Sequence, residues 1–267
     1  MNLTSHHKRI LTALLLLPVL GGALYAGGMV KAAVIALLGL LGLWEFYGLF
    51  WPGRRRAVLK SLGVFGGTLF ILDSGLGWTH NPVLFLVLLF WAIWLVFLVE
   101  YSRNKDQAEF RDYIIVIGGL FYVPLVLSLF FNLSGVEIIL VLAATFASDT
   151  GAYYTGSWLG GKKIWPVISP KKTWSGSFGG LILCLAVCLV TGALFGQGSW
   201  KHYLVLGLVL NMAAQLGDFF QSSLKRWNKV KDSGQILPGH GGILDRIDSL
   251  LLLLPVYVLF NTIFKIF

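Results

Sequence analysis

Long apolar segments dominate the pattern of hydrophobic and polar positions along the chain. A run of about 20 apolar residues is long enough to cross the hydrocarbon core of a bilayer as a helix. The runs are continuous and do not alternate with period two, which argues against an outer-membrane barrel. The pattern therefore predicts an all-α polytopic membrane helix bundle. Its nine expected transmembrane helices lie at about residues 10–27, 30–50, 61–78, 82–101, 113–133, 136–156, 176–196, 203–222 and 243–264.

Composition supports this interpretation. Of the 267 residues, 57% are hydrophobic and 12% are charged, whereas soluble chains carry about 25% charged residues. So little polar surface excludes an ordinary cytosolic enzyme and a disordered protein. The first run could be a signal peptide, but no A-x-A-like site follows it, so we expect a retained helix. Cys184 and Cys188 share one face of an apolar run and are expected to be packing residues.

The basic residues alternate from one side of the predicted bundle to the other. The formal charge of +9 would suggest a nucleic-acid partner in a soluble chain, but here the positions of the charges matter more. Of the 21 lysines and arginines, all except Lys31, Lys201 and Lys265 fall in connections on one side. The positive-inside rule therefore predicts a cytoplasmic N-terminus, and we expect membrane lipid, not nucleic acid, around this chain.

Polarity is uneven along the chain. The spans before residue 140 carry few polar groups, whereas residues 145–248 contain nearly every polar residue expected at membrane depth. We expect residues 1–140 to be a transmembrane scaffold region. Residues 141–267 are then a catalytic region whose polar pocket faces the cytoplasm.

Two carboxylates inside spans allow contrasting interpretations. Glu45 lies near the cytoplasmic end of its span with Arg54–Arg56 beyond it, so we expect its side chain to reach the lipid interface. Asp149 continues a polar stripe through an apolar helix. It is either functional or an interhelical hydrogen-bonding residue.

One face of the eighth span is polar over its whole length. Spacings of four, three, four and three place its residues on one helix face about 21 Å long. A polar ridge of that length is expected to line a wet cavity. The residues are Asn211, Gln215, Asp218, Ser222 and Lys225.

The segment after this span is rich in groups suited to phosphate and metal. Asp245 and Asp248 are one turn apart on a helix that should face Asp218, and carboxylates so arranged can cage a hard divalent cation. Gly241 and Gly242 would let backbone amides approach an anion. His240 is either functional or a hydrogen-bonding loop residue.

A second basic loop, GSWLGGKKIWPVISPKKTWSG, joins the sixth and seventh spans on the same side. It is not a Walker A loop, because it lacks that spacing and no strand precedes it. An ordinary positive-inside loop is the alternative. Asp149 comes immediately before this loop and Asp218 lies two spans later, so we expect both basic loops at one cytoplasmic opening of the bundle.

At these residues the sequence resembles the bacterial phosphatidate cytidylyltransferases, or CDP-diacylglycerol synthases. The segment SSLKRWNKVKDSGQILPGHGGILDRID is similar to their signature, and so are SDTGAYYTG, ISPKKTW and GDFFQS. The resemblance is close over about residues 140–255 and concerns hydropathy alone before them. Ser175, Gln221 and Lys229 depart from the usual family pattern of Glu, Glu and Gly.

The resemblance implies transfer of CMP from CTP to phosphatidate in the bacterial inner membrane, with Mg²⁺, room for a second cation, and a homodimer. It implies that Asp218 and Asp245 bind metal, and we add Asp149 and Asp248 to that set. Lys225 and Arg226 join Asp218 and Asp245 as the expected catalytic residues. The residues expected to bind substrate phosphates are Ser169, Lys171, Lys172, Ser222, Lys231, His240 and Arg246.

Two other functions remain as alternatives. A CTP-dependent lipid-alcohol kinase, of the polyprenol type, would need a base to deprotonate its acceptor, which phosphatidate does not. An ion-coupled transporter should show polar residues on both sides of the midplane and repeat symmetry. The polar residues of this chain gather on one side, which favours an enzyme.

Overall fold

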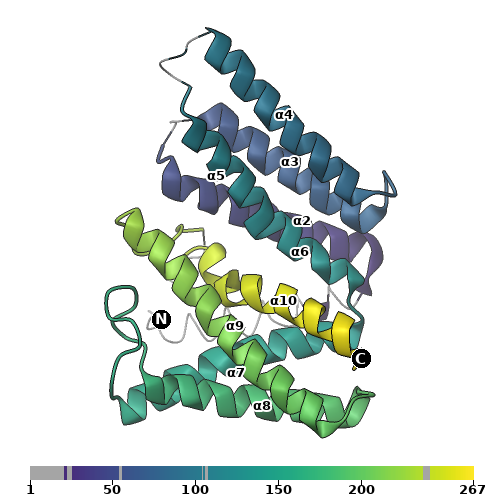
Figure 1. The fold of residues 1–267 in the computed structure, drawn as a ribbon, viewed down its shortest axis with the longest axis vertical. Coiled ribbons are helices and arrows are strands. Elements are labelled where there is room, and N and C mark those ends of the chain that lie inside the picture. The colour runs from purple at the N-terminus through teal and green to yellow at the C-terminus, as the bar shows by residue number, and fades with distance from the viewer. Residues whose placement is uncertain (1–20, 23–25, 54–55, 104, 106–107, 237–240) are drawn as a thin grey trace, which may run out of the picture. The chain divides into compact units, whose positions relative to one another are not determined.

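The structure, a computed structural model, describes residues 21–22, 26–53, 56–103, 105, 108–236 and 241–267. Most of the described residues are helical (Figure 1), and an isolated antiparallel bridge joins Lys163 and Thr173. The helices in chain order are α2 (Gly28–Phe50), α3 (Ala57–Leu76), α4 (Pro82–Arg103), α5 (Phe110–Leu120), η1 (Phe121–Leu125), α6 (Val126–Ser128), η2 (Leu129–Asn132), α7 (Gly135–Leu159), α8 (Trp174–Phe195), α9 (Trp200–Trp227) and α10 (Leu244–Phe264).

Eight helical segments among the described residues are long and apolar enough to cross a membrane. They correspond to eight of the nine predicted spans, and the remaining one, at 10–27, lies largely outside the described residues. One segment, Phe110–Asn132, runs through α5, η1, α6 and η2. Pro124 lies in its π-helical part, where the missing N–H prevents a regular helical ladder. The all-α membrane bundle is confirmed, and the chain is an integral membrane protein.

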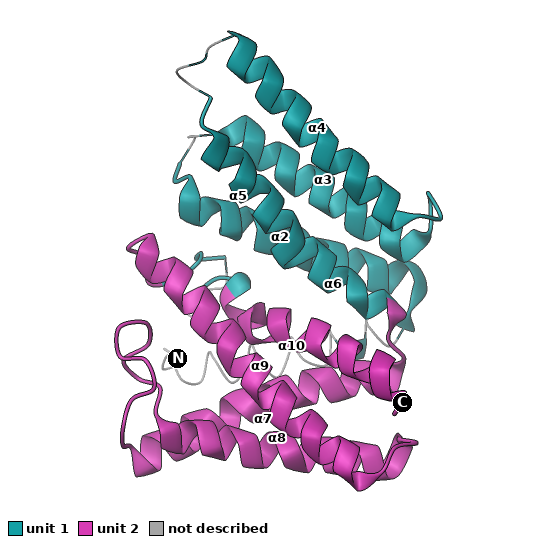
Figure 2. Cartoon of the chain, in the orientation of Figure 1, with its two compact units in different colours: residues 1–131, 232–244 teal, residues 132–231, 245–267 magenta. Residues whose placement is uncertain are grey.

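The chain divides into two compact units (Figure 2). Unit 1 comprises residues 1–131 and 232–244, and unit 2 comprises residues 132–231 and 245–267. The short segment 232–244 thus belongs with the N-terminal helices although it lies between α9 and α10. The assignment of scaffold and catalytic roles to residues 1–140 and 141–267 stays a prediction.

Unit 1 is held at one end by a cluster of polar side chains from α2 to α5. Arg56 forms ion pairs with Glu100 of α4 and Asp112 of α5. The Trp51 indole N–H donates to the same Asp112 carboxylate at 2.9 Å, and the Tyr113 hydroxyl donates to Glu100. These contacts satisfy charges that would otherwise be costly to bury between helices.

In unit 2, α7 packs closely against α8. A Cβ added at Gly180 would lie 2.6 Å from the Ser148 carbonyl oxygen, so this approach requires glycine. Cys184 and Cys188 are buried in α8, as expected of packing residues. Glu137, at the start of α7, accepts hydrogen bonds from Tyr257 and Asn261 in the second half of α10.

Candidate functional site

The polar face of α9 has two distinct parts. Asn211 is buried and its side-chain oxygen accepts a hydrogen bond from Ser148 of α7 at 2.8 Å. Gln215 exchanges hydrogen bonds with Ser177 of α8. The predicted wet ridge is therefore wrong at Asn211, because its amide joins two helices inside the unit.

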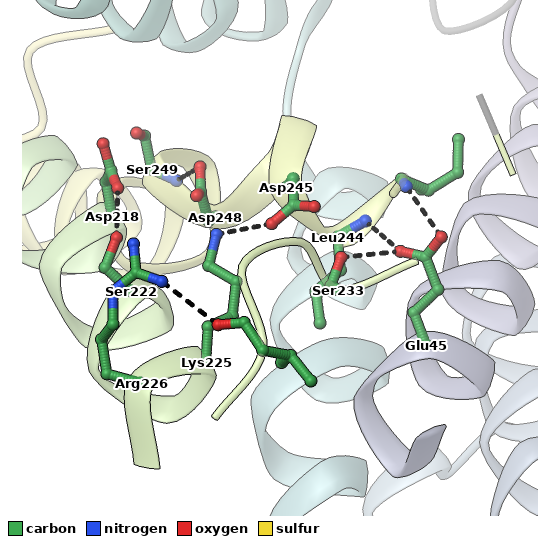
Figure 3. A network of polar contacts seen from close by, with 12 residues as sticks. Glu45, Asp218, Ser222, Lys225, Arg226, Ser233, Leu244, Asp245, Asp248 and Ser249 are labelled. Carbon is green, nitrogen blue, oxygen red and sulfur yellow. Dashed lines mark hydrogen bonds and ion pairs between the residues drawn. The ribbon is translucent and has the colours of Figure 1, made fainter. Parts of the chain in front are cut away.

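Beyond Gln215, the same face carries charged groups that are paired across helices. The Lys225 ammonium contacts the Asp245 carboxylate of α10 at 2.6 Å, and both side chains are about nine-tenths buried (Figure 3). Asp218 pairs with Lys172 from the basic loop before α8, and it also accepts a hydrogen bond from Ser222 at 3.1 Å. Asp218 and Asp245, two of the four carboxylates expected to bind metal, are thus each paired with a lysine.

A second pair of carboxylates lies beside the first. The Ser249 hydroxyl donates to Asp149 of α7 at 3.2 Å, and the Ser249 backbone N–H donates to Asp248 at 2.8 Å. Ser249 therefore contacts both carboxylates. Gly217 permits the close approach of α9 to α10, because a Cβ there would lie 2.6 Å from the Asp248 carbonyl oxygen. Unit 2 therefore gathers carboxylates from α7, α9 and α10.

This donor set suits a hard cation. Across the described parts of the chain, no group of three or more His, Cys, Asp or Glu side chains is arranged to hold a metal ion. Mg²⁺, however, is usually bound by one or two carboxylates together with water and substrate phosphates. Asp218 and Asp245 supply carboxylates of that kind, and a cation would compete for them with Lys172 and Lys225.

The residues expected to bind phosphates differ in how exposed they are and in which groups they contact. Arg226 is exposed, and its guanidinium donates to the carbonyl oxygens of Ile168 and Val230, which links the basic loop to the end of α9. Lys172 and Ser222 lie against Asp218 as described above. Ser169 is half-buried, and His240 lies outside the described residues. The exposed members are Lys171, Lys231 and Arg246.

The positions that depart from the resembled pattern differ in their surroundings. Gln221 is fully buried on α9, and neither polar atom of its amide has a hydrogen-bond partner among the described residues. Ser175 is half-buried and donates to the Gly160 carbonyl. Lys229 adopts a left-handed φ of 57°, a conformation that glycine adopts without strain, which accounts for the glycine usual at that position.

Sequence reasoning placed Glu45 wrongly and missed Ser249. The Glu45 side chain does not reach a lipid interface. It is 3% exposed and accepts hydrogen bonds from Ser233, Ile243 and Leu244 within unit 1 (Figure 3). Those partners are distant in sequence, so no local pattern points to them. Ser249 could have been noticed as the polar residue that directly follows Asp248.

Comparison with known proteins identifies relatives along nearly the whole chain. Residues 7–264 match the model of the cytidylyltransferase family. The phosphatidate cytidylyltransferase of Staphylococcus saprophyticus is 35% identical over 261 residues, and that of Staphylococcus haemolyticus is 34% identical over 257 residues. The Staphylococcus aureus protein of the same name is 34% identical over 255 residues. Each alignment covers 93% of this chain and 96% of the relative. The similarity thus extends well beyond residues 140–255.

Proposed function

Because the chain belongs to the cytidylyltransferase family and is a nucleotidyltransferase, we propose that it transfers CMP from CTP to phosphatidate. The products are CDP-diacylglycerol and pyrophosphate. The observation that carries this proposal is a set of paired charges on α9, on α10 and in the basic loop before α8. Lys225 pairs with Asp245, and Lys172 of the loop pairs with Asp218. Such a set can bind phosphates and a cation in one place.

The reaction requires that the two substrates be positioned and that the negative charge of their phosphates be neutralised. A phosphate oxygen of phosphatidate attacks the α-phosphorus of CTP, the new P–O bond forms, and the bond to the β-phosphate oxygen breaks. The attacking oxygen is already anionic, so no general base is required. The main obstacle is repulsion between two polyanions, and fixed cationic groups lower it.

The lysines can exchange partners when phosphates bind. In the structure Lys172 and Lys225 face carboxylates. Phosphate oxygens compete for the same ammonium groups, and each lysine that turns to a phosphate leaves a carboxylate available. Arg226 and the lysines of the basic loop would add positive charge near Ile168. The Arg226 guanidinium already donates a hydrogen bond to the Ile168 carbonyl oxygen, which links the end of α9 to that loop.

Asp218 and Asp245 are the residues that would hold Mg²⁺, with Asp149 and Asp248 beside them. The metal would supply neutralisation of phosphate charge. The carboxylates would orient it, and Lys225 and Asp248 are buried, which limits access of water to that part of the unit.

A bacterial inner membrane is the proposed location, with the charged groups open to the cytoplasm, where CTP is available. The acyl chains of phosphatidate would stay in lipid while its headgroup meets the nucleotide. A homodimer and a second cation belong to the proposal through the family resemblance alone. Family membership does not favour the lipid-alcohol kinase or the transporter.

A comparison of two lipid acceptors tests the function. The purified protein in detergent is given CTP and Mg²⁺ with either phosphatidate or diacylglycerol, which lacks the phosphate. We expect CDP-diacylglycerol with phosphatidate and no product with diacylglycerol. Phosphorylation of diacylglycerol would instead identify a lipid-alcohol kinase.

A further inference from the structure

The carboxylate of Glu45 accepts hydrogen bonds from both ends of the segment 232–244. The Ser233 hydroxyl donates to Oε2 at 3.1 Å, at the beginning of the segment. The backbone N–H of Leu244 donates to Oε2 at 2.8 Å, and that of Ile243 donates to Oε1 at 3.1 Å (Figure 3). One side chain of α2 therefore contacts two positions of this segment that lie 188 and 199 residues away in the sequence.

Two glycines allow this approach. A Cβ added at Gly234 would lie 2.3 Å from Glu45 Oε1, and one added at Gly242 would lie 2.3 Å from Oε2. Both distances are far below ordinary contact, so a side chain at either position would displace the carboxylate. The sequence predicted that the glycines at 241 and 242 would let an anion approach the backbone. At Gly242 the anion that lies there is the Glu45 carboxylate of the protein itself.

The same contacts cap α10. The first N–H groups of a helix have no partner within the helix, and the helix dipole favours an anion beside them. Glu45 supplies a charged acceptor to Ile243 and Leu244 at this end. Hydrogen bonds to a buried charged acceptor are stronger than those between neutral groups. These hydrogen bonds restrain the backbone at Ile243 and Leu244, where α10 begins.

We propose that Glu45 is a positioning residue for Asp245, acting through the start of α10. Leu244 and Asp245 are consecutive in the same helix, so restraint of the Leu244 amide restrains the backbone that carries the Asp245 carboxylate. This inference rests on the proposed function only because that proposal gives Asp245 a role in the reaction. The hydrogen bonds themselves can be tested without activity.

Glu45→Gln is the decisive substitution, and Glu137→Gln is its matched control. Both oxygens of Glu45 accept hydrogen bonds, whereas glutamine has one acceptor and would direct its NH₂ group at a donor. Glu137 is also buried and also bonds to α10, but at Tyr257 and Asn261, far along the helix from Asp245. Both variants therefore lose one carboxylate that contacts α10.

Hydrogen exchange of the backbone amides at 243 and 244 is the first measurement. We expect about tenfold faster exchange in Glu45→Gln than in the wild type, as loss of a charge-assisted hydrogen bond implies, and unchanged exchange in Glu137→Gln. Unchanged exchange in Glu45→Gln would overturn the proposal whatever reaction the protein catalyses. Failure of the wild type to form CDP-diacylglycerol would overturn only the proposed function.

Steady-state kinetics is the second measurement, made per amount of folded protein. We expect kcat of Glu45→Gln to fall about tenfold or more, with the KM for CTP within about threefold, because misplacement by an ångström can cost a hundredfold in rate. Equal losses in Glu45→Gln and Glu137→Gln would indicate a general structural role and contradict the proposal.

Ser233→Ala provides a milder test if Glu45→Gln does not fold. It removes one donor and leaves the two backbone donors on the carboxylate. We expect a folded protein with a kcat reduced about two- to threefold and faster exchange at 243 and 244, because one donor to the carboxylate is lost while the two backbone donors remain. Wild-type exchange and kcat in this variant would refute the positioning role.

Discussion

Replacing Gln221 by methionine measures the cost of burying an amide without partners. Gln221 is fully buried on α9, and both polar atoms of its side chain lack hydrogen-bond partners in the part of the chain that is described. Methionine has nearly the same length and shape but no strong hydrogen-bonding group. The substitution therefore removes the desolvation penalty while it keeps most of the packing.

The expected magnitude follows from that penalty. A buried polar group without a partner costs about 1–3 kcal/mol. A gain of about 1 kcal/mol in the free energy of unfolding shifts the thermal midpoint of a chain of this size by about 2–4 °C. We therefore expect Gln221→Met to raise the midpoint by at least about 2 °C in the absence of substrates.

Gln215→Met is the matched control, because Gln215 is on the same helix and exchanges two hydrogen bonds with Ser177. Its loss should lower the midpoint by about 2–4 °C. Both variants are measured in the same detergent by far-ultraviolet circular dichroism. A lower midpoint for Gln221→Met, comparable to that of Gln215→Met, would refute the reasoning, because it would show that the Gln221 amide is satisfied.

The remaining predictions concern the charges and the membrane topology. Asp245→Asn and Asp218→Asn should each leave less than about a tenth of the CDP-diacylglycerol activity at saturating Mg²⁺ in a folded protein, and higher residual activity would remove that residue from the metal site. Ser175→Glu should lower the Mg²⁺ concentration for half-maximal rate several-fold, on the order of 1 kcal/mol for the added charge, whereas an unchanged midpoint would reject this electrostatic expectation. A cysteine introduced at Val230 should be labelled from the cytoplasm and one at Ser199 only from the opposite side, and cytoplasmic labelling at Ser199 would disprove the predicted topology.

The spans could be predicted because the length of an apolar run decides whether a helix can cross a bilayer. Each of the eight segments that are long and apolar enough to cross a membrane, among the described residues, corresponds to a predicted span. The π-helical part around Pro124 could not be predicted in detail, since it depends on how the neighbouring turns recover their hydrogen bonds.

The site could be predicted only in part, because spacing along one helix does not reveal partners on another. The i, i+3 pattern placed Asp245 and Asp248 on one helix, and the structure agrees. It could not reveal that Lys225 pairs with Asp245. Glu45 was misplaced for the same reason, since a carboxylate at the end of an apolar span suggests exposure until its distant donors, such as Leu244, are known.

The position of the label in CTP tests the central claim most directly. The purified protein is incubated with phosphatidate and CTP that carries radioactive phosphorus either at the α- or at the γ-position. Transfer of CMP predicts that the α-label enters the lipid and that the γ-label is released as pyrophosphate. The Asp245→Asn variant should neither label the lipid nor release labelled pyrophosphate. Entry of the γ-label into the lipid, with the α-label retained in CDP, would contradict the account, because the protein would then be a CTP-dependent kinase.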